Sequence, residues 1–214
     1  MTILQIFKLI NLFISGGLVM WPLLFLSIIT LACIIDRIIF WKKLSKKNKK
    51  ISKLILEEYE YNSNRFLDFL KKSNSNPYSQ ILINIFNMNF SNEKDFEKVL
   101  EINLINKNKE FNKYGNIFNL TIGIAPLLGL LGTVLGLMNS FSFIDLGSVG
   151  TNTKEVTGGI SEALVSTAYG LIIAIFTISF SSYFNSCKRD EIIALREFGI
   201  KFQILFFKKL SKSE

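Results

Sequence analysis

The chain has 214 residues, of which 49% are hydrophobic and 20% are charged, with a formal net charge of +8 and no histidine. The lack of histidine excludes Ser-His-Asp and Cys-His catalysis, histidine metal sites and imidazole proton relays. The two cysteines, Cys33 and Cys187, form neither a CxxC motif nor a metal-binding spacing, and no phosphate-loop, dinucleotide or nucleophile-elbow motif occurs. We therefore expect no enzyme, no catalytic residue, no metal site and no cofactor.

Three long segments carry no charge. They are Leu18–Ile35 with 18 residues, Ile117–Ile144 with 28 and Ala163–Cys187 with 25. A bilayer core requires about 20 apolar residues, so the pattern predicts an all-α membrane protein with three transmembrane helices. The alternative, three buried helices of a soluble domain, fits poorly because such long runs recur three times. Pro22 is expected to bend the first span.

The distribution of Lys and Arg predicts the topology. Residues 42–113 hold 15 of the 25 basic residues and residues 185–214 hold 7. Basic loops stay on the cytoplasmic side, so we expect the N-terminus and the 145–161 loop outside and the middle segment and the C-terminus in the cytoplasm. The predicted segments are a periplasmic N-terminus (1–15), a first span (16–41), a cytoplasmic helical domain (42–113), a second span (114–144), a periplasmic loop (145–158), a third span (159–187) and a cytoplasmic C-terminal helix (188–214).

The two cytoplasmic parts are predicted to be helical. In the tail, apolar residues recur every three or four positions, at Ile192, Leu195, Phe198, Phe202, Leu205 and Phe206. Segment 93–113 interleaves apolar and charged residues in a similar way. Both parts are expected to extend the second and third spans, which makes those two helices long. The sequence SNSNP at 73–77 predicts a loop.

Small residues recur at spacings of three and four in the second and third spans. The predicted helix-packing residues are Gly129, Gly132, Gly136 and Gly170. Such stripes let helix backbones approach closely in lipid, within one chain or between copies. Thr133 and Thr167 lie among them, and both fall in the outer half to the middle of the bilayer. Two interpretations stay open: the stripes only pack helices, or their polar face lines a shared interior.

Within the three spans, acidic residues occur only at the edges. Glu162 precedes the third span, where it is either part of an ion pathway or an interfacial acid at a helix start. Asp36 and Arg37 end the first span, where they can pair with each other or extend to the interface. With no histidine and one marginal carboxylate, any proton carrier near mid-membrane has to come from a second subunit.

The segments IGIAPLLGLLGTVLGLMNSF (122–141) and GGISEALVSTAYGLIIAI (158–175) resemble the MotA/TolQ/ExbB proton-channel family. The likeness is nearest to the ExbB branch, with TolQ second; MotA proteins have four spans rather than three. The first span, at 16–41, is similar to the family's GG-x-x-x-x-PL-x-x-x-S start and acid-Arg end. The family's functional threonines fall on Thr133 and Thr167, and its third-helix glutamate falls on Glu162.

The resemblance implies a homo-oligomeric, pentameric ring whose second and third helices line a pore. The pore would enclose a dimeric ExbD- or TolR-like single-span partner whose aspartate carries protons. Proton flow would then drive a TonB-like or TolA-like protein. No nucleic acid is expected, and the basic segments fit membrane lipid headgroups.

Two positions depart from the family pattern: Phe176 stands where a proline is usual, and Asp36 replaces the commoner glutamate. The sequence leaves four matters open: an ExbB-like or a Tol envelope-integrity system, the energised transporter and its substrate, protons or sodium, and ring size. A passive membrane scaffold is the alternative from another functional class. It would not require hydroxyls at matched depth on two helices.

Overall fold

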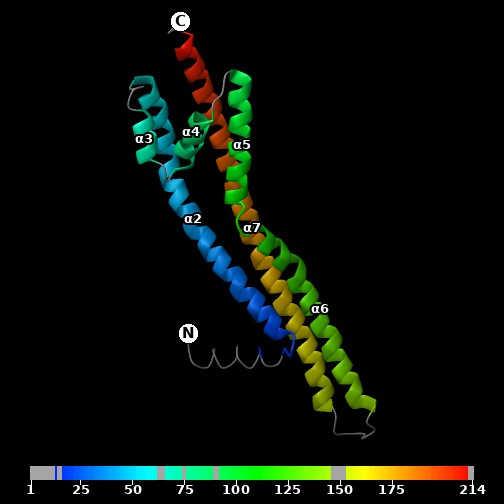
Figure 1. Cartoon of the computed structure of the whole chain (residues 1–214). Helices are drawn as coiled ribbons and strands as arrows, with labels where there is room; N and C mark the ends of the chain where they lie inside the picture. Colours follow the sequence, from blue (N-terminus) through cyan, green and yellow to red (C-terminus); the bar gives the residue numbers. More distant parts are fainter. Residues whose placement is uncertain are drawn as a thin grey trace. The chain divides into compact units, whose positions relative to one another are not determined.

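The computed structural model describes residues 13, 16–61, 66–73, 76–88, 92–145 and 153–211. Within these residues the chain forms helices and no strand, which confirms the predicted all-α class (Figure 1). The helices are α2 (Met20–Tyr61), α3 (Phe66–Lys72), α4 (Pro77–Asn87), α5 (Glu93–Phe111), α6 (Gly115–Asp145) and α7 (Thr153–Leu210). Most of segments 1–15 and 145–158, predicted to be periplasmic, lies outside the described residues.

The chain divides into two units, and each is described by itself. The span unit comprises residues 1–35 and 114–182, and the second unit comprises residues 36–113 and 183–214. Helices α2 and α7 contribute to both units because each is long. The division follows composition: the span unit holds nearly all of the uncharged sequence, and the second unit holds most of the lysines.

Three helices are long and apolar enough to cross a membrane: α2 over Met20–Leu44, α6 over Gly115–Ser142 and α7 from Val156 onward. Large apolar side chains of the span unit point outward, among them Leu18, Trp21, Phe25, Leu127, Phe141 and Ile175. A soluble protein does not expose so much contiguous apolar surface. The prediction of three transmembrane helices is therefore confirmed.

Two prolines lie in the spans, in different helical contexts. α2 begins at Met20, so Pro22 lies in its first turn, where a missing N–H breaks no intrahelical hydrogen bond. The bend predicted at Pro22 therefore has no cause there. Pro126 lies inside α6, where it removes a backbone donor from the helix.

The two predicted extensions of the spans differ in form. α7 is a single helix of 58 residues, so the tail continues the third span as expected. Segment 93–113 forms a helix of its own, α5, whose end at Phe111 is separated from the start of α6 at Gly115. Tyr114, at the junction, has a φ of 69°, which is incompatible with a continuous right-handed helix. The cytoplasmic extension of the second span is therefore a separate helix.

In the second unit, asparagines fix where the short helices begin. The Asn76 side chain accepts a hydrogen bond from the Tyr78 N–H at 2.9 Å, and Pro77 occupies the first turn of α4. Asn92 likewise accepts from the Asp95 N–H at 2.9 Å and starts α5. Of the loop predicted at 73–77, Asn76 is the cap of α4 and Pro77 is its first residue, while residues 74 and 75 lie outside the described residues.

An aromatic core holds the second unit together. Phe202 of α7 is fully buried, and its ring centroid lies 4.8 Å from that of Tyr59, 5.8 Å from that of Phe66 and 6.5 Å from that of Phe96. Each of these rings comes from a different helix, so one side chain of α7 ties together α2, α3 and α5. The buried positions include Leu195 and Phe198, as the periodicity of the tail predicts.

Several polar side chains of the second unit are hydrogen-bonded to one another. The Lys107 ammonium donates to Gln80 Oε1 and, at 2.6 Å, to Glu110 Oε2. Asn84 Nδ2 donates to Asn103 Oδ1 at 2.9 Å, which adds a second tie between α4 and α5. Burial, and secondarily the nearby carboxylate of Glu191, raises the pKa of the Tyr78 phenol, so this side chain stays neutral.

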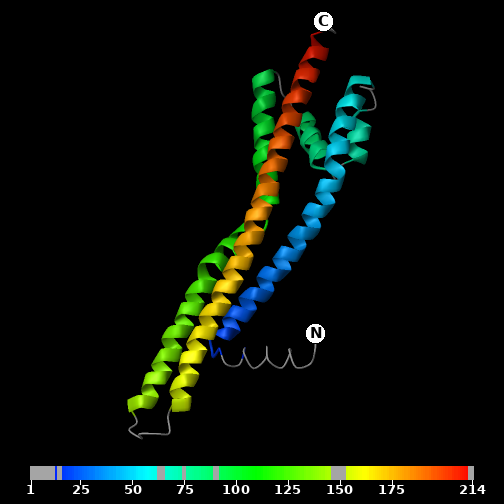
Figure 2. The ribbon, with the colours of Figure 1, turned by 180° about the vertical axis from the view of Figure 1, so that it is seen from behind.

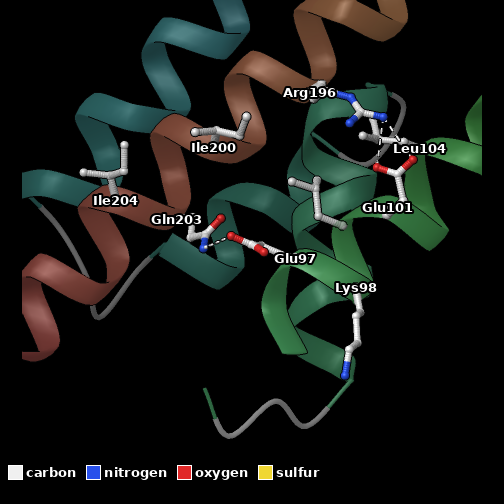
Figure 3. Close-up of a pocket in the computed structure, with 9 residues that line it drawn as sticks. Glu97, Lys98, Glu101, Leu104, Arg196, Ile200, Gln203 and Ile204 are labelled. Atoms are coloured by element: carbon white, nitrogen blue, oxygen red, sulfur yellow. Dashed lines mark hydrogen bonds and ion pairs between the residues drawn. The ribbon is translucent and has the colours of Figure 1, made fainter. Parts of the chain in front are cut away.

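A groove of about 550 Å³ lies between α5 and α7 in the second unit (Figure 3). Leu104 of α5 and Ile200 and Ile204 of α7 form its apolar part. At one end Arg196 pairs with Glu101 at 2.9 Å, and within the groove Gln203 Nε2 donates to Glu97 Oε1 at 3.4 Å. These two contacts tie α5 to α7 across the groove.

Candidate ion-pathway site

Helices α6 and α7 run side by side in the span unit and are packed at backbone distance (Figures 1 and 2). A side-chain carbon added to Gly170 would lie 2.5 Å from the Ala125 carbonyl oxygen, and one added to Gly129 would lie 3.0 Å from the Thr167 Cα. At Gly136 the same atom would lie 2.7 Å from the Gly159 carbonyl oxygen. The small-residue stripes thus form one seam between two helices of the same chain.

Thr133 and Thr167 lie about one helical turn apart along this seam. Thr167 Oγ1 donates to the carbonyl oxygen of Gly129 across the seam at 2.9 Å. Thr133 is four residues from Gly129, or about 6 Å along the helix axis. Its hydroxyl donates to the Leu130 carbonyl of its own helix at 2.6 Å. The structure therefore places the two predicted threonines on facing helices, within about one helical turn of each other.

Both threonines border an exposed apolar face of α6 and α7. On α6 this face carries Leu130, Leu137 and Phe141, and on α7 it carries Ile160, Leu164 and Leu171. All six are at least 40% exposed, whereas Thr133 and Thr167 are half-buried. The two hydroxyls are thus polar groups at the edge of an otherwise apolar surface. We call this surface, together with Thr133 and Thr167, the threonine face.

Glu162 lies on another face of α7. It is five residues before Thr167, and at about 100° per residue the two side chains leave the helix roughly 140° apart. Tyr169 and Ile173, which share the stripe of Glu162, pack against Val19, Met20 and Leu23 of the α2 side. Glu162 itself lies against Gly17, just before α2. The three residues predicted for the ion pathway therefore separate into a threonine pair and a carboxylate at the α2–α7 seam.

Asp36 and Arg37 are paired in the second unit. The guanidinium Nη2 lies 3.1 Å from Asp36 Oδ2, and its carbon lies 4.4 Å from the centre of the Phe40 ring. The Arg37 side chain is buried and the Asp36 side chain is about half exposed. Within the described part of the chain, no three histidine, cysteine or acidic residues come together as metal ligands would.

A second polar contact inside the span unit escaped the sequence reasoning. The hydroxyls of Thr30 in α2 and Thr121 in α6 lie 2.8 Å apart, and both side chains are buried. Hydroxyls in lipid commonly bond across helices in this way. Both residues are single threonines in apolar runs, with no neighbouring motif, so only the packing of α2 on α6 identifies them as a pair.

Three membrane-length helices, two of them joined by a glycine seam that holds a pair of hydroxyls, define a multi-pass membrane protein. The model of one family, the MotA/TolQ/ExbB proton channel family, matches residues 69–197. That match covers more than half of the chain. The chain belongs to the MotA/TolQ/ExbB proton channel family.

Several relatives of the chain have ExbB in their names. The chain is 36% identical over 184 residues to the ExbB-like protein 3 of Synechocystis sp., which covers 86% of this chain and 88% of the relative. It is 25% identical over 201 residues to the ExbB-like protein 1 of the same organism, covering 93% and 79%. It is 52% identical over 62 residues to the biopolymer transport protein ExbB of Salmonella typhimurium, covering 28% and 25%.

Proposed function

We propose that the chain is the ring-forming stator subunit of a proton-driven motor in the bacterial inner membrane. Copies of it, five by the resemblance, surround a dimeric ExbD/TolR-like partner with one span per subunit. The ring couples the proton motive force to a TonB-like protein and through it to outer-membrane transport. Membership of the proton channel family and the ExbB-like relatives support this assignment.

The observation that carries the proposal is the threonine face. Thr133 and Thr167 present hydroxyls within about one helical turn of each other, at the edge of a surface whose other large side chains are leucine, isoleucine and phenylalanine. Each hydroxyl donates its proton to a carbonyl, of Leu130 or of Gly129, and can accept a hydrogen bond from a protonated carboxyl group. If the hydroxyl rotates away from that carbonyl, it can donate to the ionised carboxylate instead. The face is therefore suited to a partner's carboxylate that gains and loses a proton.

The chain does not place an acid of its own on that face. Residues 117–144 and 163–187 carry no charge, and Glu162 points toward the start of α2. A threonine hydroxyl does not ionise near neutral pH, so the face can solvate a proton carrier but cannot be one. The proposal thus requires a second subunit, with a carboxylate at the level of Thr133 and Thr167.

Two alternatives make different demands on the same structure. A TolQ-like subunit would use the same face but would serve the Tol envelope-integrity system through a TolA-like protein. A passive scaffold would use the glycine seam for packing and would have no need of hydroxyls at matched depth. Hydroxyl oxygens can coordinate sodium as well as line a hydrated proton path. Flux measurements with each ion therefore decide which ion is transported.

Deletion of the gene for this chain in its own host tests the assignment. We expect loss of energy-dependent uptake through outer-membrane transporters, with restoration by the wild-type chain. Leakage of periplasmic proteins and detergent sensitivity, with normal uptake, would instead assign the chain to the Tol system. Neither phenotype, in a host with no second copy, would contradict the motor and favour the scaffold.

A further inference from the structure

Gly17 has a backbone conformation that other residues rarely adopt. Its φ is +70°, in the left-handed region, where a residue with a Cβ atom is strained and glycine is not. The Gly16 N–H donates to the Phe13 carbonyl at 3.2 Å, and the Met20 N–H donates to the Gly17 carbonyl at 3.2 Å. The chain therefore turns at Gly16 and Gly17 and enters α2 directly.

The carboxyl group of Glu162 covers the position that a side chain at Gly17 would occupy. A Cβ atom built on Gly17 would overlap Glu162 Oε1 and would lie 2.5 Å from Cδ and 3.0 Å from Cγ. Side-chain carbons in proteins essentially never approach other heavy atoms closer than 3.0 Å. The end of the Glu162 side chain thus rests on the bare Cα face of Gly17.

The start of α2 cannot easily move away from Glu162. Val19, Met20 and Leu23 are at most 3% exposed, and they form a cluster with Ala125 of α6 and Ala174 of α7. Shifting this turn would open the cluster, whereas the Glu162 side chain can rotate. A side chain at position 17 would therefore displace the carboxyl group rather than the turn.

We propose that Gly17 is a positioning residue for Glu162. Because Gly17 has no side chain, the carboxyl group of Glu162 can lie at the seam between α2 and α7, away from the threonine face. An acid near a membrane span is costly unless it faces protein or water. Glu162 lies nine residues after the first residue of α7, Thr153, so it is not the acid at a helix start that the sequence allowed, and its contact with Gly17 is what places it against protein. Only the importance of this placement for transport rests on the proposed function; the placement itself is a statement about the fold.

The first test measures how accessible Glu162 is in membranes that hold the complete complex. A membrane-permeant carbodiimide labels protonated carboxyl groups, and peptide mass spectrometry gives the rate at Glu162 alone. We expect Gly17→Ala to raise this labelling rate several-fold, because the new methyl group displaces the carboxyl group from its position against residue 17. Gly158→Ala is the matched control, since nothing lies within 4 Å of a Cβ built there. An unchanged rate in Gly17→Ala would overturn the proposal.

A second test separates the carboxyl contact from backbone strain. Glu162→Asp withdraws the carboxyl group by one methylene and so reduces its overlap with a methyl group at position 17, although the Cγ atom stays 3.0 Å from that methyl group. The strain of alanine in the left-handed region is present in either background and cancels in the comparison. We expect Gly17→Ala to reduce the amount of chain in the membrane when Glu162 is present and to have less effect in the Glu162→Asp background. Equal losses in both backgrounds would overturn the proposal, also where Gly17→Ala alone fails to accumulate.

These outcomes are independent of the proposed function. Carbodiimide labelling of Glu162 requires no proton flow and no partner activity. If the chain proves to be a passive scaffold, the labelling difference between Gly17→Ala and Gly158→Ala still stands or fails by itself. If the motor is confirmed and the labelling rates are equal, the motor remains and the positioning role is lost.

Discussion

Replacing Thr133 and Thr167 with valine is expected to abolish energy-dependent function while leaving the oligomer and its partner binding intact. Valine has nearly the shape of threonine but cannot exchange hydrogen bonds with a partner carboxylate. That carboxylate is then poorly solvated when it releases its proton, so its pKa rises. One pKa unit corresponds to a factor of about ten in the proton-release equilibrium, and we expect at least about that loss for each substitution.

Assembly should survive both substitutions because little packing is lost. Thr133 donates only to its own helix, at Leu130. Thr167 gives up one bond across the seam, to Gly129, and such bonds within membranes average about 0.6 kcal/mol. Native mass spectrometry of the purified complex checks assembly, and an uptake assay in cells checks function.

Thr177→Val is the matched control for the threonine pair. Thr177 is on the same helix and is buried, and its hydroxyl donates only to the Ile173 carbonyl of α7, at 2.7 Å. It lies ten residues beyond Thr167, and we expect normal function after the change. Serine at 133 or 167 keeps the hydroxyl and should also preserve function. Wild-type activity in both valine variants would show that these threonines only pack helices.

Gly170→Ala is expected to weaken the seam between α6 and α7, although alanine is the better helix former. The new methyl group would lie 2.5 Å from the Ala125 carbonyl oxygen and 3.2 Å from the Gly129 Cα, both of which are backbone atoms. Neither can rotate away, so the helices have to separate. Overpacking of this kind costs about 1–3 kcal/mol, against which the gain in helix propensity is at most about 1 kcal/mol.

Gly123→Ala provides the comparison for that loss. Gly123 lies inside α6, whereas Gly170 lies inside α7, and nothing lies within 4 Å of a Cβ built on Gly123. Thermal unfolding in detergent should show a lower midpoint and a dissociating oligomer for Gly170→Ala and an unchanged or slightly higher midpoint for Gly123→Ala. Equal stability of the two variants would mean that the seam is looser than its backbone distances indicate.

Much of this architecture was readable from composition and periodicity. Charge-free runs identified the three membrane helices, and the spacing of Leu195, Phe198 and Phe202 identified the buried face of the tail. The small-residue stripes indicated close packing, and the structure shows that this packing joins two helices of one chain. These features are local or periodic, so a single stretch of sequence is enough to predict each of them.

Other features depend on contacts between distant residues. The φ of 69° at Tyr114 separates α5 from α6. A tyrosine in the sequence does not predict a positive φ. Glu162 could be assigned to a helix and a depth, but only the packing of α2 shows that it faces Gly17 rather than the threonine face. The Thr30–Thr121 pair likewise exists only because two helices meet at that level.

The most direct test of the central claim is proton flux into proteoliposomes under an imposed membrane potential. The purified chain alone should leak few protons, because its threonine face has hydroxyls but no carboxylate of its own. The chain with its single-span partner should conduct protons, and replacing the partner's membrane aspartate with asparagine should stop the flux. A large and steady proton conductance from the chain alone would contradict the account.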